Sequence, residues 1–400
     1  MKTLLDRPRH GGHVFLTGGT GYLGALLAAE MLRLGWATRI VIPTRRAGDP
    51  GLSPELAAEL SAAGLDLEAA RSLITLVPWG GAETCTRQEL QQLMTSFGID
   101  TVVHSAGCLD YFNEGALEMV NVNFTRTLAQ AASAAGVSFF AFVSTAYAAG
   151  YSGATVPESL LREPDRDPTA YTSTKRQAEH IVAQSGIPFL ILRPSIVIGN
   201  ACDGRYSGKR YGLYQQWMGV ERLLTDRYHE TLHTVATDQP LNLLHQDAFQ
   251  RAAGAALSWM PDNAVMNVVT DSALAPSMKD LWIQLCEVTR PKQIVFYPSM
   301  DDVDLKAINL RQRAYLSFAQ TNLEIGAYGW SFDRGWLQVL RAERGLSFTE
   351  TTAATIRTCQ DRFVENSALF RQYRTRFSPH LSADIAVLEP SDFIPTNAAA

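Results

Sequence analysis

The stretch from His13 to Gly24, HVFLTGGTGYLG, constrains the fold more than any other part of the chain. It begins with an apolar run, Val14–Leu16, which is typical of a buried parallel strand. Gly18, Gly21 and Gly24 then follow at intervals of three residues, ahead of a run of good helix formers. Glycines in a strand-turn-helix unit let the backbone approach a pyrophosphate, and the amides of the helix N-terminus attract its charge. The spacing is GxxGxxG and not the GxGxxG of the ordinary Rossmann fingerprint, but its place between a strand and a helix predicts a dinucleotide site, with a flexible surface turn as the alternative.

The composition is that of a globular protein, because 46% of the 400 residues are apolar and 19% are charged. A net charge of −5 gives no indication of nucleic-acid binding. No apolar run reaches the ~18 residues of a membrane span, and the early charges and prolines are unlike a signal peptide. The five cysteines form no CxxC pair and no zinc-like spacing. We therefore expect a cytoplasmic protein with reduced thiols and no metal site.

Apolar runs and helical stretches alternate through the first half of the chain. Further strands are predicted at Arg39–Ile42, Leu73–Val77, Thr101–Ala106 and Phe139–Ser144. The helices between them are predicted near residues 54–63, 86–97 and 115–135, the first with Ser53 as its cap. This alternation predicts an α/β fold with a doubly wound, parallel Rossmann-type sheet. His104, inside one of these strands, is expected to be a core histidine rather than a catalyst.

Two arginines, Arg45 and Arg46, follow the second predicted strand. A carboxylate at this place, about 20 residues after the glycines, favours NAD, whereas arginine suits the 2′-phosphate of NADP. The pair therefore predicts NADPH, and two solvated surface arginines are the alternative. Small residues after the fourth predicted strand, Ala106 and Gly107, would let the cofactor lie across the strand ends.

A tyrosine and a lysine four residues apart, Tyr171 and Lys175, fall in a predicted helix and therefore share one helical face. The lysine ammonium favours the phenolate and can also hold a ribose hydroxyl, so the tyrosine can act as a general acid on a carbonyl oxygen. Thr145, directly after a predicted strand, can orient the same oxygen. The three residues predict a reductase site, and a surface Tyr-Lys pair is the alternative.

These motifs resemble those of the extended short-chain dehydrogenases/reductases. Within that superfamily they are similar to the fatty acyl-CoA reductases and to the thioester-reductase domains of carboxylic acid reductases and nonribosomal peptide synthetases. The segments that carry the resemblance are residues 17–24, 121–123, 142–147, 171–175 and 192–199. The match is incomplete, because such proteins usually have Gly-Asp-Leu after the third strand, whereas this chain has PWGGA at residues 78–82. Adenine recognition is therefore left open.

The resemblance also implies site residues and a domain division. It implies that Thr145, Tyr171 and Lys175 are catalytic and that Gly18, Gly21 and Gly24 hold the pyrophosphate, while Arg45 faces the 2′-phosphate and Pro194 with Ser195 flanks the nicotinamide. The full expected cofactor set is Thr17, Gly18, Thr20, Gly21, Tyr22, Leu23, Gly24, Arg45, Arg46, Ala106, Gly107, Lys175, Pro194 and Ser195. We expect an NADP-binding domain at residues 1–200, to which 241–270 return, and a smaller, mostly helical substrate lobe at 201–240 and 271–400.

The implied activity is NADPH-dependent reduction of an acyl thioester, carried on CoA or on a carrier protein, to an aldehyde or further to an alcohol. Two alternatives stay open. One is an NADP-dependent oxidoreductase of a ketone, sterol, sugar or other carbonyl compound. The other is a dinucleotide sensor without activity, against which Tyr171 and Lys175 argue. The acyl chain and the oligomeric state are not predicted.

Three further features of the second half have competing interpretations. The sequence His229–His233 matches the zinc motif HExxH, but its flanks are unlike a zinc helix and we expect a coincidence. The glycine-rich loop with Arg205, Lys209 and Arg210 is either the mouth for a CoA or carrier phosphate or an ordinary connection. An aromatic stripe is expected to be core rather than part of an acyl channel: Trp330, Phe332, Trp336, Phe348, Phe363, Phe370 and Tyr373.

Overall fold

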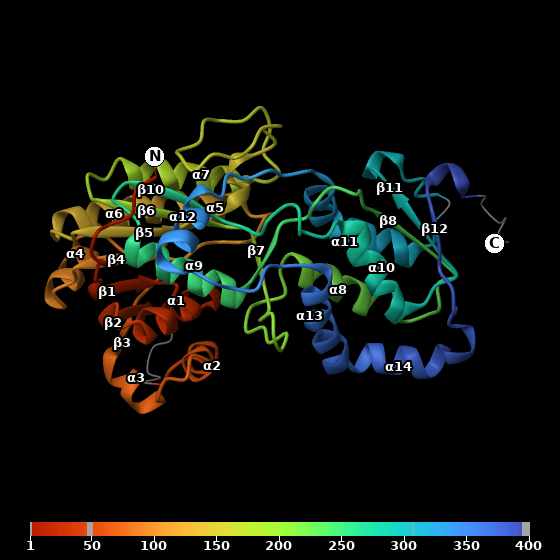
Figure 1. Cartoon of the computed structure of the whole chain (residues 1–400), viewed down its shortest axis with the longest axis horizontal. Coiled ribbons are helices and arrows are strands. Elements are labelled where there is room, and N and C mark those ends of the chain that lie inside the picture. Colours follow the sequence, from red (N-terminus) through yellow and green to blue (C-terminus); the bar gives the residue numbers. More distant parts are fainter. Residues whose placement is uncertain (1, 46–50, 307, 394–400) are drawn as a thin grey trace. The chain divides into compact units, whose positions relative to one another are not determined.

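A computed structural model of the chain describes residues 2–45, 51–306 and 308–393 (Figure 1). The chain divides into two compact units. The first contains the residues up to Val197 together with Gln246–Val269 and Phe332–Thr349, and the second contains Ile198–His245, Thr270–Ser331 and the residues from Glu350 on.

The first unit is built on a seven-stranded parallel sheet in the order β10-β6-β5-β4-β1-β2-β3. Its strands are β1 (Gly12–Thr17), β2 (Ala37–Thr44), β3 (Ile74–Pro78), β4 (Thr101–His104), β5 (Phe139–Val143), β6 (Phe189–Pro194) and β10 (Ala264–Val268). Central strands such as β5 are buried throughout, as in parallel sheets with both faces covered. The order of strands reverses at β1, so the carboxyl ends of β1 and β4 flank a switch point of the kind that binds ligands.

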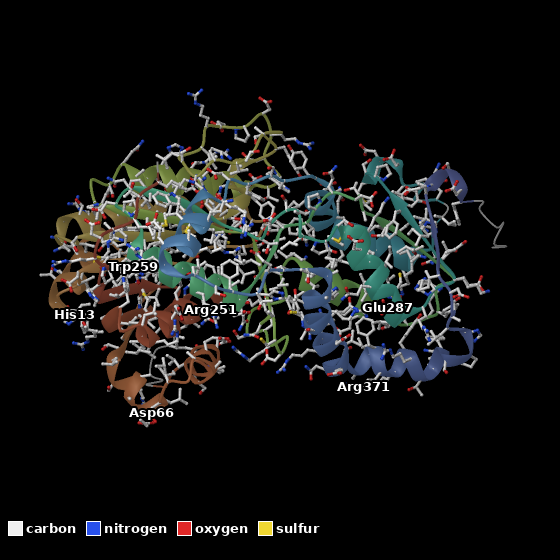
Figure 2. The ribbon with its side chains drawn as sticks, in the orientation of Figure 1. His13, Asp66, Arg251, Trp259, Glu287 and Arg371 are labelled. Atoms are coloured by element: carbon white, nitrogen blue, oxygen red, sulfur yellow. The ribbon has the colours of Figure 1, made fainter. Side chains whose placement is uncertain are left out.

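Helices connect these strands and cover the sheet. They are α1 (Tyr22–Arg33), α2 (Pro54–Ala62), α3 (Leu67–Leu73), α4 (Arg87–Ser96), α5 (Glu114–Leu117), α6 (Phe124–Ala134), α7 (Ala170–Ala183), α9 (Gln246–Trp259) and α12 (Gly335–Arg344). A π-helical turn, η1 (Glu118–Asn123), links α5 to α6, and a 3-10 turn, η2 (Ala146–Ala149), follows β5. Trp259 at the end of α9 packs against the Arg344 guanidinium of α12 at 4.4 Å from the ring centroid, which ties the late helix to this unit (Figure 2).

The second unit contains a three-stranded parallel sheet in the order β12-β11-β8. The strands are β8 (Thr231–Val235), β11 (Gln293–Tyr297) and β12 (Ala386–Leu388). Its helices are α8 (Leu213–Leu223), α10 (Met278–Thr289), α11 (Leu310–Ala327), α13 (Ala353–Asn366) and α14 (Ala368–Phe377). An exposed ion pair joins two of them, because Glu287 of α10, labelled in Figure 2, accepts from both terminal guanidinium nitrogens of Arg357 on α13. Two short strands, β7 (Ile196–Ile198) and β9 (Leu243–His245), pair with each other and complete the described strands.

The predicted fold class is confirmed, and the differences are local. Ser53 does cap α2, with its Oγ accepting from the Leu56 amide, and Pro54 begins the helix. β2 continues through Pro43 to Thr44, beyond its predicted end, because the edge strand β3 pairs with it along that length. β4 ends two residues before the predicted Ala106. The three strands of the second unit were missed, because their apolar runs are short and lie in a mostly helical region.

No helix among residues 2–45, 51–306 and 308–393 combines the length and the apolar character that a membrane span requires.

Candidate active site

Glycines close the turn between β1 and α1. Gly18 has a φ of +71°, which favours glycine, and a Cβ atom there would lie 2.7 Å from the backbone nitrogen of Ala106. A Cβ atom at Gly24 would overlap the Gly18 carbonyl. Gly21 is the N-cap of α1 and offers no side chain to the first helical amides, and the first turn carries no acidic residue. This end of α1 therefore suits a bound anion such as a pyrophosphate.

Thr17 joins the ends of β1 and β4. Its Oγ1 accepts a hydrogen bond from the Ala106 amide at 3.3 Å and lies 2.6 Å from His104 Nδ1. The other ring nitrogen of His104 lies 2.9 Å from Thr125 Oγ1. Burial holds the pKa of His104 well below its ordinary value, so the ring stays neutral. The structure thus places His104 in the core, with both ring nitrogens bonded to threonine hydroxyls.

The remaining residues of the glycine motif contact other parts of the first unit. Thr20 accepts a hydrogen bond on its carbonyl from Ser53 Oγ at 3.4 Å, and the Tyr22 hydroxyl donates to Gln246 Oε1 at 3.1 Å. Leu23 is half-buried in the first turn of α1. These contacts attach the turn to the starts of α2 and α9.

Arg45 directly follows β2, and its side chain is exposed. A Cβ atom at Gly81 would lie 3.0 Å from the Nε atom of Arg45, so the guanidinium runs beside the segment that follows β3. Arg46, the second arginine of the prediction, lies outside the described residues. The cation therefore lies at the carboxyl end of β2, on the side of β3, and β1 separates it from the end of β4.

Asn121, in the π-helical turn η1, fixes the segment after β4 to α7. Its Oδ1 accepts from the Cys108 amide at 2.8 Å, while its Nδ2 donates to the Cys108 carbonyl at 3.3 Å and to Thr174 Oγ1 at 3.1 Å. A Cβ atom at Gly107 would lie 3.4 Å from the Asn121 amide oxygen and 4.0 Å from Lys175 Nζ. The small residue therefore leaves room beside Lys175, and Asn121 is a site residue to which sequence reasoning gave no role.

Tyr171 and Lys175 lie one turn apart on α7, and Lys175 connects that helix to β5. Its ammonium donates to the Val143 carbonyl at 2.6 Å and lies 4.2 Å from the centroid of the Phe142 ring. Thr145 comes two residues after Val143 and caps η2, with its Oγ1 accepting from an amide of that turn at 3.4 Å. The structure thus places Lys175 and Thr145 at the carboxyl end of β5, with Tyr171 one helical turn before Lys175.

Burial changes the proton affinity of both side chains on α7. It lowers the pKa of Lys175 to about 7, although the nearby Glu179 carboxylate limits the fall. It raises the pKa of Tyr171, to which Tyr111 adds, since the two rings lie 5.6 Å apart. Tyr171 therefore holds its proton, while Lys175 is close to exchanging its own at neutral pH.

Two serine hydroxyls at the carboxyl ends of the strands are buried without a hydrogen-bond partner among the described residues. Ser105 follows β4, and Ser195 follows β6 and the buried Pro194. A buried hydroxyl without a partner is costly. Together with the glycine cradle at Gly18, these hydroxyls fit a nicotinamide dinucleotide laid across the strand ends.

A family model described as Male sterility protein (NAD_binding_4) matches residues 16–249, more than half of the chain. The chain belongs to this family. The match and the fold confirm the resemblance to extended short-chain dehydrogenases/reductases, and they support an NAD(P)-dependent oxidoreductase.

Two curated proteins are similar to part of this Male sterility protein family member. The 3 beta-hydroxysteroid dehydrogenase/Delta 5-->4-isomerase of Mycobacterium tuberculosis is 29% identical over 202 residues, which cover 47% of this chain and 48% of that protein. Erythronolide synthase EryA2 of Saccharopolyspora erythraea is 31% identical over 145 residues, covering 34% of this chain. The chain spans about half the length of the first relative and 4% of the second.

Solved structures show the same fold over most of the chain. The terminal R domain from the myxalamid PKS-NRPS pathway has a TM-score of 0.71 at 21% identity, covering 89% of this chain and 91% of that one. The reductase domain of the aureusimine cluster has a TM-score of 0.64 at 17% identity, covering 94% of each chain. A thiolation-reductase di-domain from an archaeal non-ribosomal peptide synthetase has a TM-score of 0.62 at 16% identity, covering 94% and 93%.

The HExxH sequence of this family member does not form a zinc helix. His233 lies in strand β8 and His229 just before it, so the two rings lack the one-turn helical spacing of that motif. Burial lowers the pKa of each to about 4. No cluster of three or more metal-ligating side chains occurs in the described part of the chain.

Contacts within the second unit hold two side chains of the glycine-rich loop. Arg210 donates to Glu221 Oε2 at 2.8 Å and lies 4.9 Å from the Phe363 ring centroid. Tyr206 stacks on Tyr214 at 3.9 Å. Arg210 therefore already has an anionic partner, which weakens its predicted role at a carrier phosphate.

The aromatic stripe belongs to two different units. Trp336 is buried in the first unit, and the other buried members lie in the second: Trp330, Phe363, Phe370 and Tyr373. The core interpretation is confirmed for these five side chains. Trp336 also lines a cavity of the first unit.

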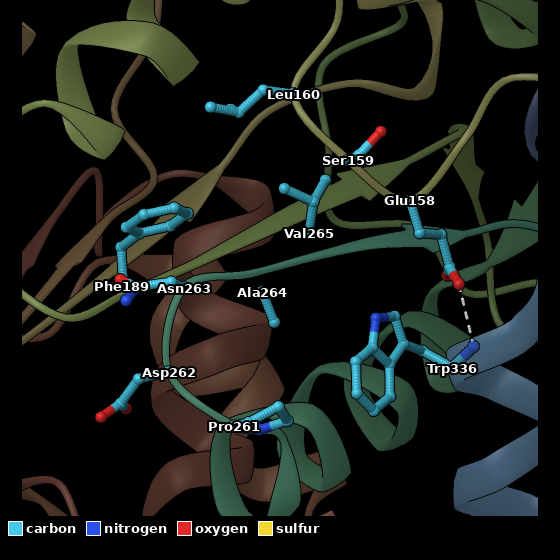
Figure 3. Close-up of a pocket in the computed structure, with 10 residues that line it drawn as sticks. All are labelled: Glu158, Ser159, Leu160, Phe189, Pro261, Asp262, Asn263, Ala264, Val265 and Trp336. Atoms are coloured by element: carbon cyan, nitrogen blue, oxygen red, sulfur yellow. Dashed lines mark hydrogen bonds between the residues drawn. The ribbon is translucent and has the colours of Figure 1, made fainter. Parts of the chain in front are cut away.

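A cavity of about 260 Å³ lies in the first unit, away from the predicted site residues (Figure 3). Its lining includes Phe189, which begins β6, and Ala264, which begins β10. The cavity therefore sits at the amino ends of these strands, whereas ligands of open parallel sheets bind at the carboxyl ends.

Proposed function

We propose that this protein reduces an acyl thioester, carried on CoA or on a carrier protein, to an aldehyde with NADPH as the reductant. The observation that carries the proposal is Lys175, buried against the end of β5 and one helical turn from Tyr171. The thioester as substrate class is supported by the similar structures, which are two reductase domains, one of them a terminal R domain, and a thiolation-reductase di-domain.

The cofactor would be held by the chain along the carboxyl ends of the strands. Gly18, Gly21 and Gly24 would receive the pyrophosphate, and Arg45 would pair with the 2′-phosphate of NADP. Pro194 and Ser195 would flank the nicotinamide, and Lys175 would donate to a ribose hydroxyl. When bound, the reduced nicotinamide supplies the hydride.

The proton chemistry falls to residues of α7 and β5. Tyr171, protonated at neutral pH because of its burial, donates its proton to the thioester carbonyl oxygen as that carbon is reduced. Thr145 orients the same oxygen through its hydroxyl. The resulting hemithioacetal expels the thiol, so that one thioester, one hydride and one proton give one aldehyde and one thiol. Lys175 carries the positive charge that favours the tyrosinate after transfer.

A second candidate is reduction of a ketone or oxidation of an alcohol by the same residues. It is favoured by the 29% identity to the steroid dehydrogenase/isomerase over about half of each chain. The two candidates differ in product, because only a thioester releases a thiol.

A substrate panel separates the two candidates. Purified protein is incubated with acyl-CoAs of several lengths, an acylated carrier protein and a 3-ketosteroid, each with NADPH or NADH. We expect NADPH-dependent release of thiol in stoichiometry with an aldehyde found by mass spectrometry. Turnover of the ketone alone would overturn the thioester proposal and support the second candidate.

The cofactor assignment has its own test in the variant Arg45→Ala. Loss of the guanidinium should raise the Kd for NADPH about tenfold, since hydrogen bonds to a charged group are worth about 1.5–3 kcal/mol. The Kd for NADH, which lacks the 2′-phosphate, should change little. Equal losses for both cofactors in isothermal titration calorimetry would remove Arg45 from the phosphate site.

A further inference from the structure

Glu179 and Arg193 form an ion pair that is closed off from solvent, with 0% exposure of both side chains. Arg193 donates from Nε to Glu179 Oε1 at 2.8 Å and from a terminal nitrogen to Oε2 at 2.6 Å. The same Oε1 accepts from Ser144 Oγ at 2.5 Å. Burying two charges costs free energy that their attraction offsets only in good geometry, so the pair by itself is weak evidence of a stabilising role.

The three members of this network are each adjacent to a residue of the proposed site. Ser144 immediately precedes Thr145, and Glu179 lies four residues after Lys175 on the same face of α7. Arg193 immediately precedes Pro194 at the end of β6. One carboxylate thus connects the strand ends β5 and β6 to the helix that carries Tyr171.

Arg193 also reaches away from the site. Its terminal nitrogens donate to the carbonyls of Pro157 at 3.0 Å and Ser159 at 2.9 Å. Every polar atom of the guanidinium is therefore directed either at Glu179 or at the 157–159 segment. This leaves the guanidinium little freedom to move, and the carboxylate is held in one position.

We propose that Glu179 is a positioning residue for the reaction: it holds Ser144, and through it Thr145, and it places a negative charge one helical turn from the Lys175 ammonium. The proposal rests on the proposed function for its kinetic readout and on the proposed NADPH site for its binding readout. Glu179 touches neither substrate nor cofactor in this role. Its effect passes entirely through Thr145 and Lys175.

The charges around Lys175 make the direction of the effect predictable. Glu179 faces it from α7 and Arg193 stands behind that carboxylate on β6, while His104 on β4 is neutral. Burial lowers the pKa of Lys175, and the Glu179 carboxylate opposes that fall. Removing the carboxylate therefore removes the opposing influence and leaves the Arg193 cation unbalanced. Lys175 then loses its proton at a lower pH.

The central experiment is the pH dependence of the Glu179→Gln variant. We expect the alkaline limb of kcat/KM to move to lower pH by about 1 unit, the effect of one opposite charge at short range. The affinity for NADPH is measured by calorimetry across the same pH range without substrate. It should fall at the same lower pH, because Lys175 would donate to the ribose as the protonated ammonium. This second readout holds even if thioesters prove not to be substrates, so the failure of either proposal is recognisable.

Glu179→Gln leaves a buried arginine without its anion and can fail to fold. The double variant Glu179→Gln with Arg193→Met removes both charges, and we expect its alkaline limb between that of the wild type and that of the single variant. Ser144→Ala keeps both charges and loses one hydrogen bond to Glu179. We expect it to lower kcat severalfold with the limb unmoved, because only the placement of Thr145 changes.

A matched control is available on the same helix. Arg176 pairs with Asp167 at 2.6 Å, and Asp167→Asn removes that carboxylate charge while Ser144, Glu179 and Arg193 all stay unchanged. It should lower the melting temperature and leave the alkaline limb in place. Limbs of both Glu179 variants that coincide with the wild type, in turnover and in NADPH binding, would overturn the proposal and leave the pair a purely structural feature.

Discussion

Two buried glutamates in the first unit have opposite surroundings. Glu179 has side-chain partners only, from β6 and from the residue after β5. Glu158, with 1% of its side chain exposed, accepts from two backbone amides: that of Asn267 in β10 at 3.1 Å and that of Trp336 in α12 at 2.9 Å (Figure 3). Lys2 completes its partners as a cation.

The two carboxylates differ in the part of the sheet that they contact. β10 is an edge strand of the seven-stranded sheet. Glu158 accepts a hydrogen bond from one of its backbone amides, as a carbonyl of a neighbouring strand would. Glu158 thus ends the sheet, whereas Glu179 connects the residues at the carboxyl ends of its strands. A buried carboxylate is therefore no sign of an active site by itself, and the elements that supply its partners decide its role. Two sets of variants test this contrast.

The largest effect is expected at the carboxyl end, from Tyr171→Phe. The variant keeps the ring and loses only the proton donor, so turnover should fall about 10²–10⁴-fold, the usual contribution of a general acid. The melting temperature and the Kd for NADPH should stay near those of the wild type. Turnover close to the wild-type rate on every substrate of the panel would show that Tyr171 is not the acid.

At the sheet edge, we expect Glu158→Gln to lower stability and to leave turnover unchanged. The amide keeps one acceptor oxygen where the carboxylate has two, so one of the two backbone amides loses its partner and the free energy of unfolding should fall by about 1–3 kcal/mol. Urea unfolding at neutral pH measures this loss. Turnover per folded molecule should not change, and a large kinetic defect in a stable variant would erase the contrast between the two glutamates.

The smallest effect is the pH dependence of that stability. Burial raises the pKa of Glu158 above its ordinary 4.5, although Lys2 and the two amides oppose the rise. The folded state therefore binds this proton more tightly than the unfolded state. Its contribution to stability is full below pH 4.5 and is lost as the pH rises through the folded-state pKa.

Urea unfolding in steps from pH 4 to pH 8 should show this loss in the wild type and not in Glu158→Gln. All other groups titrate alike in the two proteins, so the difference between their curves isolates Glu158. A difference that grows in the other direction, with the wild type gaining relative stability as the pH rises, would mean that Lys2 and the amides outweigh burial.

Much of the first unit could be predicted from short segments of sequence. The strand before Gly18, the helix after it and the pairing of Tyr171 with Lys175 depend on neighbours in the chain, because periodicity and one-turn spacing are local properties. The same holds for the cap at Ser53, whose hydroxyl meets an amide three residues on. Local rules also placed most strands within two residues of their observed ends.

Only the tertiary structure decided which charges are buried together and which element a sequence motif forms. Ser144, Glu179 and Arg193 meet from three segments of the chain, and Glu158 meets Trp336 across 178 residues. His229 and His233 match a helical motif, but His233 lies in β8 and His229 precedes that strand. The aromatic stripe is divided between the cores of the two units. Burial and charge pairing are sums over contacts between distant residues, so no spacing along the chain reveals them before the sheet has formed.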